Sequence, residues 1–222
     1  LIDFQDATAM DVVVGPDTTV TFDLADDKGE YLQITGNAEF DLFGLVSASG
    51  GFGVEKSSQT VTLTDGTSVA TDVLTIGLSQ ATAFAGYNQG TEADDDDIGL
   101  RLEEVDLALA LFNEQVDVGA VARSWTAVQA GVGSAAFVGV DGLTMAVDTV
   151  AIEVNQAALD STLIDFQDAT AMDVVVGPDT TVTFDLAEDK GEYLQITGNA
   201  EFDLFGLVIA SGGFGVEKSI QT

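Results

Sequence analysis

The side chains best suited to chemistry lie in one short acidic stretch. Glu92, Asp94, Asp95, Asp96 and Asp97 place five carboxylates within six consecutive positions. Ca²⁺ takes about six to eight oxygen ligands, many of them carboxylates, and a bound cation relieves the repulsion between neighbouring acids. We therefore predict a calcium site at these five residues, on a polar loop that protrudes from the fold. A solvated acidic loop tip without an ion is the alternative.

The composition argues against an enzyme. The chain has no His and no Cys, which removes the commonest general base, thiolate nucleophiles and Cys-ligated zinc. Paired carboxylates cleave glycosidic bonds in some enzymes, but such sites add basic residues, and this chain has six in all. We expect Arg101 and Arg123 to pair with neighbouring acids such as Glu103 and Asp117. Trp125, the single Trp, is expected in the core, with stacking on a sugar as the alternative.

The charge balance limits the partners and the compartment. The chain has 38 acidic and 6 basic residues, a formal net charge of −32. Phosphate backbones and anionic lipids attract Lys and Arg, so nucleic acid and anionic membrane surfaces are excluded as partners. Self-repulsion of this size requires salt screening or bound cations, which favours an extracellular location. No stretch reaches the ~18 to 20 uncharged apolar residues of a membrane span.

The chain contains a long internal repeat. Residues 163–222 match residues 1–60 at 57 of 60 positions, at a fixed offset of 162. The differences are Asp26→Glu188, Ser47→Ile209 and Ser58→Ile220. We therefore divide the chain into one complete period, residues 1–162, and the first part of the next, residues 163–222. A fixed period of this kind is typical of solenoids, filaments and extended stalks.

Alternation of apolar and polar residues predicts strands through most of the period. The parity of this alternation flips at four residue pairs: Ser79-Gln80, Glu103-Glu104, Gly133-Ser134 and Asp148-Thr149. In a flat strand such a slip turns the apolar side chains to the other face, whereas a bulge or tight corner keeps them together. Four corners in one period favour an all-β, parallel β-helix-like β-solenoid. A repeat of bulged antiparallel β-sandwiches is the alternative.

One glycine-rich segment resembles a calcium-binding motif. Gly50-Gly51-Phe52-Gly53-Val54-Glu55 resembles one nonapeptide of the RTX β-roll, although Glu55 replaces the Asp and no second copy follows directly. A glycine-rich corner, where backbones approach closely, is the simpler explanation.

Longer segments resemble the tandem repeats of giant, acidic, secreted bacterial proteins of the surface-adhesin or RTX-exoprotein kind. The resemblance lies in segments such as Val73-Leu-Thr-Ile-Gly-Leu-Ser79 and Trp125-Thr-Ala-Val-Gln-Ala, and it extends over nearly the whole period. In those repeats the place of residues 87–98 often holds a recognisable calcium-loop sequence, which is degenerate here. The resemblance implies an extracellular structural role.

These observations together predict a non-enzymatic structural repeat. We expect an extracellular stalk, spacer or filament, stabilised by calcium, whose partners are neighbouring repeats of the same chain or other subunits of a fibre. The alternative is a repeated module that binds a glycan or another surface ligand. That alternative requires an exposed row of like residues such as Thr19 and Thr21, or an exposed platform formed by Trp125.

Overall fold

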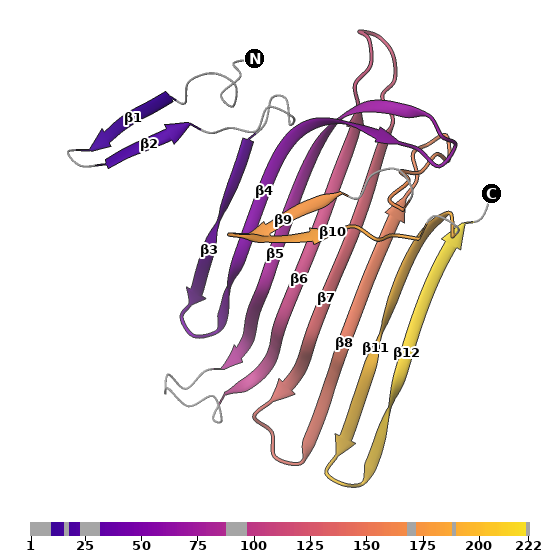
Figure 1. Ribbon diagram of the computed structural model, residues 1–222. Helices are drawn as coiled ribbons and strands as arrows, with labels where there is room; N and C mark the ends of the chain where they lie inside the picture. The colour runs from indigo at the N-terminus through magenta and orange to yellow at the C-terminus, as the bar shows by residue number, and fades with distance from the viewer. Residues whose placement is uncertain are drawn as a thin grey trace.

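The computed structural model describes residues 10–15, 18–22, 32–87, 97–167, 172–187 and 190–220 (Figure 1). Strands form most of these residues, and turns or extended segments form the rest. The prediction of an all-β chain is therefore confirmed. No helix in these ranges is long and apolar enough to cross a membrane.

Eight long strands form one antiparallel sheet in the order β12-β11-β8-β7-β6-β5-β4-β3 (Figure 1). They are β3 (Leu32–Leu42), β4 (Val46–Thr62), β5 (Ser68–Tyr87), β6 (Ile98–Glu114), β7 (Ser124–Val138), β8 (Leu143–Gln156), β11 (Glu192–Leu204) and β12 (Val208–Ile220). From β3 to β8 each strand pairs with the next along the chain, so this part of the sheet is a meander.

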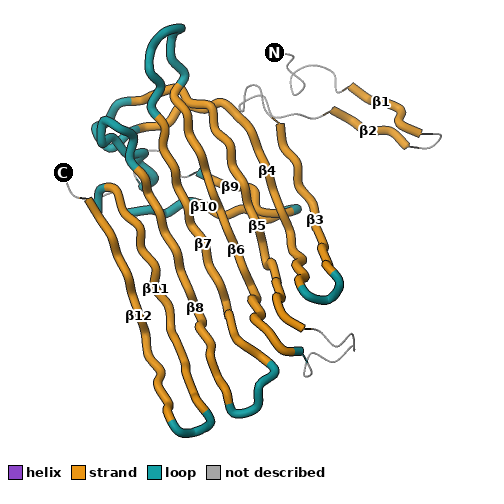
Figure 2. The backbone as a smooth tube through the Cα atoms, turned by 180° about the vertical axis from the view of Figure 1, so that it is seen from behind, coloured by secondary structure: helices purple, strands orange, loops and turns teal. Residues whose placement is uncertain are grey.

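Two short hairpins complete the described structure. The first joins β1 (Met10–Gly15) to β2 (Thr18–Phe22), and the second joins β9 (Asp173–Gly177) to β10 (Thr180–Thr183). The β9–β10 hairpin lies across one face of the long sheet, against β4, β5 and β6. Figure 2 shows the same sheet from behind, with the β1–β2 hairpin beyond the β3 edge. Residues 11–21 and 173–183 are copies of the same sequence.

The expected parallel coil does not occur in the described ranges, where every strand pair is antiparallel. The parity flips are irregularities inside long strands and not the corners of a coil. Gln80, Glu104 and Thr149, one at each of three flips, have left-handed φ values of 48°, 53° and 48°. Antiparallel pairing with bulges fits the sandwich alternative, and nothing in these ranges confirms a solenoid.

The bulges keep one face of the sheet apolar through most of its length. In β6, Leu102 and Val105 flank the flip and face Ala135 and Val132 of β7. Directly opposed residues share a face, and the register of β3 with β4 runs without a shift. The rows on both sides of the flips therefore continue on one side of the sheet. We call this side, which carries Leu100, Leu102, Val105, Leu107, Leu109 and Leu111 of β6 and their cross-strand partners, the apolar face. The opposite side, which carries β9–β10, is the hairpin face.

The buried core lies between the hairpin face and the segment that crosses it. We call residues 157–167 and 172–187 of that segment the clasp. The clasp buries Ile164, Phe166, Val174, Val176, Phe184 and Leu186 against Val61, Leu63, Val73, Phe112 and Trp125 of the sheet. Most of the clasp, from residue 163 onward, belongs to the second period, so the core joins the two periods.

Candidate assembly site: the junction between periods

The copied sequence forms the same long hairpin at both ends of the sheet. In the first copy Leu32 pairs with Lys56 and Leu42 with Val46. In the second copy Leu194 pairs with Lys218 and Leu204 with Val208, which is the same register displaced by 162 residues. The turn is also reproduced, because Phe43 and Phe205 take left-handed φ values of 55° and 53°. The local structure of the repeat therefore does not depend on its neighbours.

The two copies differ in which edge of the hairpin is paired. In the second copy β11 pairs with β8 of the preceding period, while the outer edge of β12 has no paired strand among the described residues. In the first copy β4 pairs with β5 of its own period, while the outer edge of β3 has none. Each open edge is thus a copy of an edge that is paired at the other end of the sheet.

A side-chain contact fixes the register at the β8–β11 junction. The ladder shifts between Thr197 and Asn199. There Asn199 Nδ2 donates hydrogen bonds to Asp148 Oδ1 at 3.0 Å and to Thr149 Oγ1 at 2.7 Å. The hydrogen bonds from Asn199 and then from Thr149 lower the pKa of Asp148, because they stabilise its charged form. Asn37, the copy of Asn199, lies on the open strand β3.

Glycines let the clasp lie directly on the sheet. Gly53 of β4 and Gly77 of β5 are cross-strand partners on the hairpin face. A Cβ at Gly53 would lie 2.2 Å from the carbonyl oxygen of Val175, and one at Gly77 would lie 2.4 Å from the Cα of Val176. The glycine-rich segment of β4 therefore lies within a strand, and β9 packs directly on it. We call this contact surface, formed by Gly53 and Gly77, the seat of the clasp. The prediction of a corner at these glycines was wrong, because they lie within strands. The predicted close approach of backbones is confirmed.

Hydrogen bonds anchor the start of the clasp. Leu63 forms an isolated antiparallel bridge with Ile164. The amide of Thr64 donates to the carbonyl of Leu163 at 3.0 Å, and the amide of Asp165 donates to the carbonyl of Thr62 at 2.9 Å. These bonds attach the second period to the β4–β5 turn of the first.

Trp125 lies beneath the clasp. Its side chain is 2% exposed, and its indole Nε1 donates to the carbonyl of Thr162 at 2.9 Å. The expected core position is confirmed, and a buried ring offers no platform for a sugar. The Arg123 guanidinium lies 5.3 Å from the centre of the indole ring.

The two arginines pair with acids, but with different ones from those expected. Arg123 donates to Glu114 through Nη2 at 2.7 Å and through Nε at 2.8 Å, and it contacts Asp160 at 3.3 Å. This pairing lowers the pKa of Glu114 and raises that of Arg123. Arg101 pairs with Asp97 at 3.1 Å. The Arg123 pairs connect the end of β6 with the segments before β7 and after β8, whereas the Arg101 pair joins residues four positions apart at the start of β6.

Tyr193 closes the other end of the clasp. Its hydroxyl donates to Glu153 at 3.1 Å and accepts from the Ala187 amide at 3.0 Å. Burial, the largest cause, raises the pKa of Tyr193 to about 12 because it disfavours the phenolate. The ring thus joins β8, β11 and the clasp.

Identical residues in the two copies show what the junction buries. Val174 of the clasp is completely buried, whereas its copy Val12 in β1 is 36% exposed. Phe52 and Val54 of β4 are half-buried, whereas their copies Phe214 and Val216 in β12 are exposed. Val12 lacks the sheet of a preceding period, whereas Phe214 and Val216 lack a β5 strand beside β12 among the described residues.

The predicted calcium residues are only partly within the described ranges. Glu92, Asp94, Asp95 and Asp96 lie outside them. Asp97 is 4% exposed; its Oδ2 accepts the hydrogen bond from Arg101, while its Oδ1 has no hydrogen-bond partner among the described residues. Over the described residues, no three Asp or Glu side chains form a group that could hold a metal ion. The calcium site remains a prediction.

Sequence reasoning missed the junction itself. The open edges, the Asn199 contact and the seat at Gly53 and Gly77 all require knowledge of which strands pair. The sequence held no signal specific to these residues, because 57 of the 60 copied positions recur unchanged. Comparison of the chain with protein-family models, curated proteins and solved structures finds no match.

Proposed function

We propose that the chain is a section of an extracellular structural array in which one antiparallel sheet continues from period to period. Such an array serves as a stalk, spacer or filament in a surface or secreted protein. In it, β3 of each period pairs with β8 of the period before, and a clasp from each period covers the hairpin face of its predecessor.

One observation carries the proposal. The same hairpin occurs at both ends of the sheet in the same register, with opposite edges paired. A β5 strand of the second period placed beside β12 would repeat the β4–β5 contacts, and the β8 strand of a preceding period placed beside β3 would repeat the β8–β11 contacts. The pattern therefore propagates without a new kind of contact, as in other repeat proteins.

The proposal sets a length for each period. Strands β3 to β8 belong to one period, and six strands at ~4.8 Å add about 29 Å across the sheet. Electron microscopy or small-angle scattering of arrays with increasing numbers of complete periods measures this increment. The expected result is a longest dimension that grows by about 29 Å per period. A compact particle whose longest dimension does not follow period number would refute the proposal.

A second test uses the open edge of the chain itself. A labelled peptide that copies residues 143–156, the sequence of β8, is expected to bind the β3 edge in the way that β8 binds β11. Fluorescence anisotropy measures this binding. Asn37→Ala should weaken binding of the peptide. Asn199→Ala should not, because Asn199 lies on β11, which is already paired with β8 of the same chain. Equal binding to both variants contradicts the proposed edge.

Calcium belongs to the same proposal. The net charge of −32 and the acidic stretch at residues 92–97 support a role for cations in stabilising the fold. Removal of Ca²⁺ with a chelator at constant ionic strength should lower the melting temperature, and Ca²⁺ should restore it. An unchanged melting temperature contradicts a role for calcium.

A further inference from the structure

The apolar face carries almost no charge in a strongly acidic chain. Cross-strand pairing places six positions of each of the eight strands on this face, from the row of Lys56 and Leu74 to the row of Leu42 and Val46. These positions include Lys56, Lys218 and Glu192 toward one margin and no other charged residue. Acids of the same strands, such as Asp106 and Glu201, alternate with apolar neighbours and so lie on the hairpin face.

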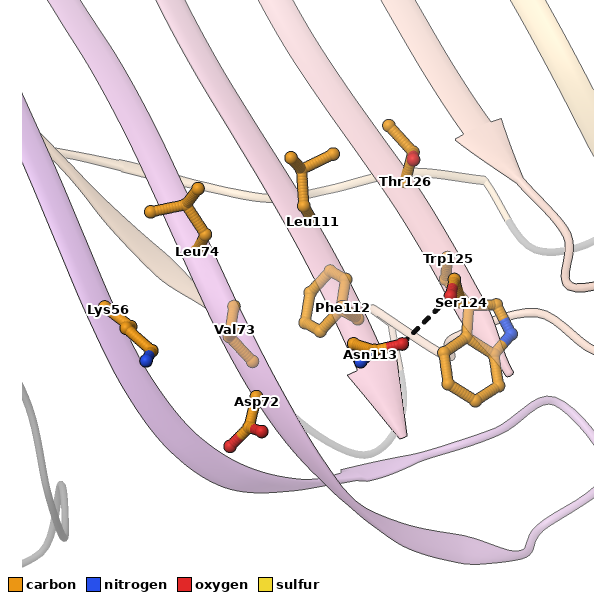
Figure 3. A pocket seen from close by; sticks show the side chains of 10 residues that line it. All are labelled: Lys56, Asp72, Val73, Leu74, Leu111, Phe112, Asn113, Ser124, Trp125 and Thr126. Carbon is orange, nitrogen blue, oxygen red and sulfur yellow. Dashed lines mark hydrogen bonds between the residues drawn. The ribbon is translucent and has the colours of Figure 1, made fainter. Parts of the chain in front are cut away.

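Large side chains on this face are accessible to solvent. Leu100 is 45% exposed and Met145 is 49% exposed. Together with Phe137 and Phe202 they line an apolar groove of about 470 Å³. At the other end of the face, Leu74 and Leu111 stand on neighbouring strands beside a second groove of about 410 Å³ (Figure 3).

The area is larger than an isolated soluble chain normally exposes. Eight strands ~4.8 Å apart, with about ten residues of ~3.3 Å along each, give a footprint on the order of 1,000 Å². The largest apolar patch on a typical monomer is about 300 to 600 Å², and a stable interface buries about 800 Å² on each partner. The apolar face is therefore large enough for a stable dimer.

We infer that the apolar face binds the apolar face of a second copy of this chain, which makes a two-layered sheet. Two such faces pack about 10 Å apart in aligned sandwiches. The contact brings few carboxylates together, because Glu192 at the margin is the one acid in these rows, and it leaves the acidic hairpin faces outward. The pairing is lateral, so it goes beyond the end-to-end continuation of the array.

The charge distribution favours a second copy over other occupants. An acidic partner would place carboxylates against an apolar surface, which costs free energy unless each is paired. A second copy matches the face in width, spacing and chemistry, and in an array the match repeats with every period. Polar side chains end the face at Asp72, Asn113 and Ser124, and the Ser124 hydroxyl donates to Asn113 Oδ1 at 3.1 Å.

Sedimentation equilibrium of the whole chain tests this inference. The wild-type chain is expected to form dimers at micromolar concentrations. The double variant Leu100→Glu with Met145→Glu should raise the dissociation constant on the order of a hundredfold or more, because it buries unpaired charge. Ile209→Glu is the matched control: Ile209 pairs with Asp203 on the hairpin face, is 69% exposed, and replaces the Ser of the first copy. This control should dimerise like the wild type.

Two further measurements keep the result interpretable. Fluorescence of Trp125, which is buried under the clasp, reports whether each variant is folded; if the double variant unfolds, Leu100→Gln with Met145→Gln takes its place. Small-angle scattering separates the two kinds of dimer, because face-to-face pairing thickens the particle while edge-to-edge pairing widens it. Wild-type dimers that widen without thickening overturn the inference but support the proposed array. A wild-type chain that stays monomeric at these concentrations also overturns the inference. This holds even if the monomer binds neutral phosphatidylcholine vesicles and floats with them in a flotation assay. Equal dimerisation of the folded double variant and the control also overturns it.

Discussion

Gly53→Ala tests the seat of the clasp with an internal control. The added Cβ would lie 2.2 Å from the Val175 carbonyl oxygen and 3.1 Å from Val175 Cγ1, both on the clasp. Gly215 is the same residue in the second copy, where the nearest atom to an added Cβ is Thr197 Cγ2 at 3.8 Å. Gly215→Ala therefore makes the same change in the same local sequence without a clash.

The magnitude follows from two opposing effects. An Ala in place of Gly inside a strand favours the folded state by about 0.5 to 1 kcal/mol, and this gain applies to both variants. Overpacking at Gly53 costs about 1 to 3 kcal/mol. Complete release of the clasp would expose Val174, Val176, Phe184 and Leu186, at about 1.5 to 3 kcal/mol each, so we expect a strained shift of the clasp in preference to its release. The two variants should differ in free energy of unfolding by about 1 to 3 kcal/mol.

Urea unfolding of the whole chain measures the difference, with Trp125 fluorescence as the signal. Midpoints are compared at unchanged slope, which indicates that the denatured state is the same in both variants. Hydrogen exchange locates the effect: the Phe184 amide, which donates to the Met172 carbonyl at 3.0 Å, should exchange faster in Gly53→Ala than in Gly215→Ala. If Gly53→Ala is as stable as Gly215→Ala, the clasp does not lie on the glycines and the junction described above is wrong.

Three further predictions concern the same junction. Asn199→Ala should lower the free energy of unfolding by about 1 kcal/mol because two hydrogen bonds are lost, whereas Asn37→Ala on the open edge should have little effect; equal losses in chemical denaturation would argue against the β8–β11 register. Trp125→Phe should lower it by about 1 to 3 kcal/mol through lost volume and the lost indole donor, and calorimetry that finds no change would place the ring outside the core. The pKa of Tyr193 in the folded chain is raised to about 12 from 10.0. The stability that its protonated hydroxyl contributes is therefore complete below pH 10.0 and is lost as pH rises toward 12. Tyr193→Phe should remove that part of the alkaline loss of stability, and an identical alkaline profile in the two chains would contradict it.

Much of the local structure was predictable from the sequence. The flips at Ser79-Gln80, Glu103-Glu104 and Asp148-Thr149 each coincide with a left-handed residue inside a strand. The positions were predictable because a parity change in the alternation has only local solutions, a bulge or a corner, that keep apolar side chains on one face. The favoured solution, a corner, was wrong, and the bulges belong to the alternative. The burial of Trp125 was also predictable, since a large ring in an apolar strand most often packs in a core.

The candidate sites were less predictable. The pairing of Arg123 with Glu114 and Asp160 depends on where strand ends meet, and sequence proximity suggested Asp117 instead. The seat at Gly53 was assigned to a corner because glycine marks close backbone approach without indicating which backbone approaches. Of the five predicted calcium residues only Asp97 lies within the described ranges. The effect of a chelator on the melting temperature tests the calcium prediction.

The sequence by itself determined that the chain is an all-β repeat with a period of 162 residues, without His or Cys chemistry, and with parity flips at defined positions. Only the tertiary structure decided that the strands pair antiparallel, that the copied hairpin leaves complementary edges open, and that the clasp lies on one face. Alternation of period two arises within a single strand and is the same for parallel and antiparallel partners. The direction of pairing and the choice of face depend on contacts between residues far apart in the chain, which no local pattern encodes.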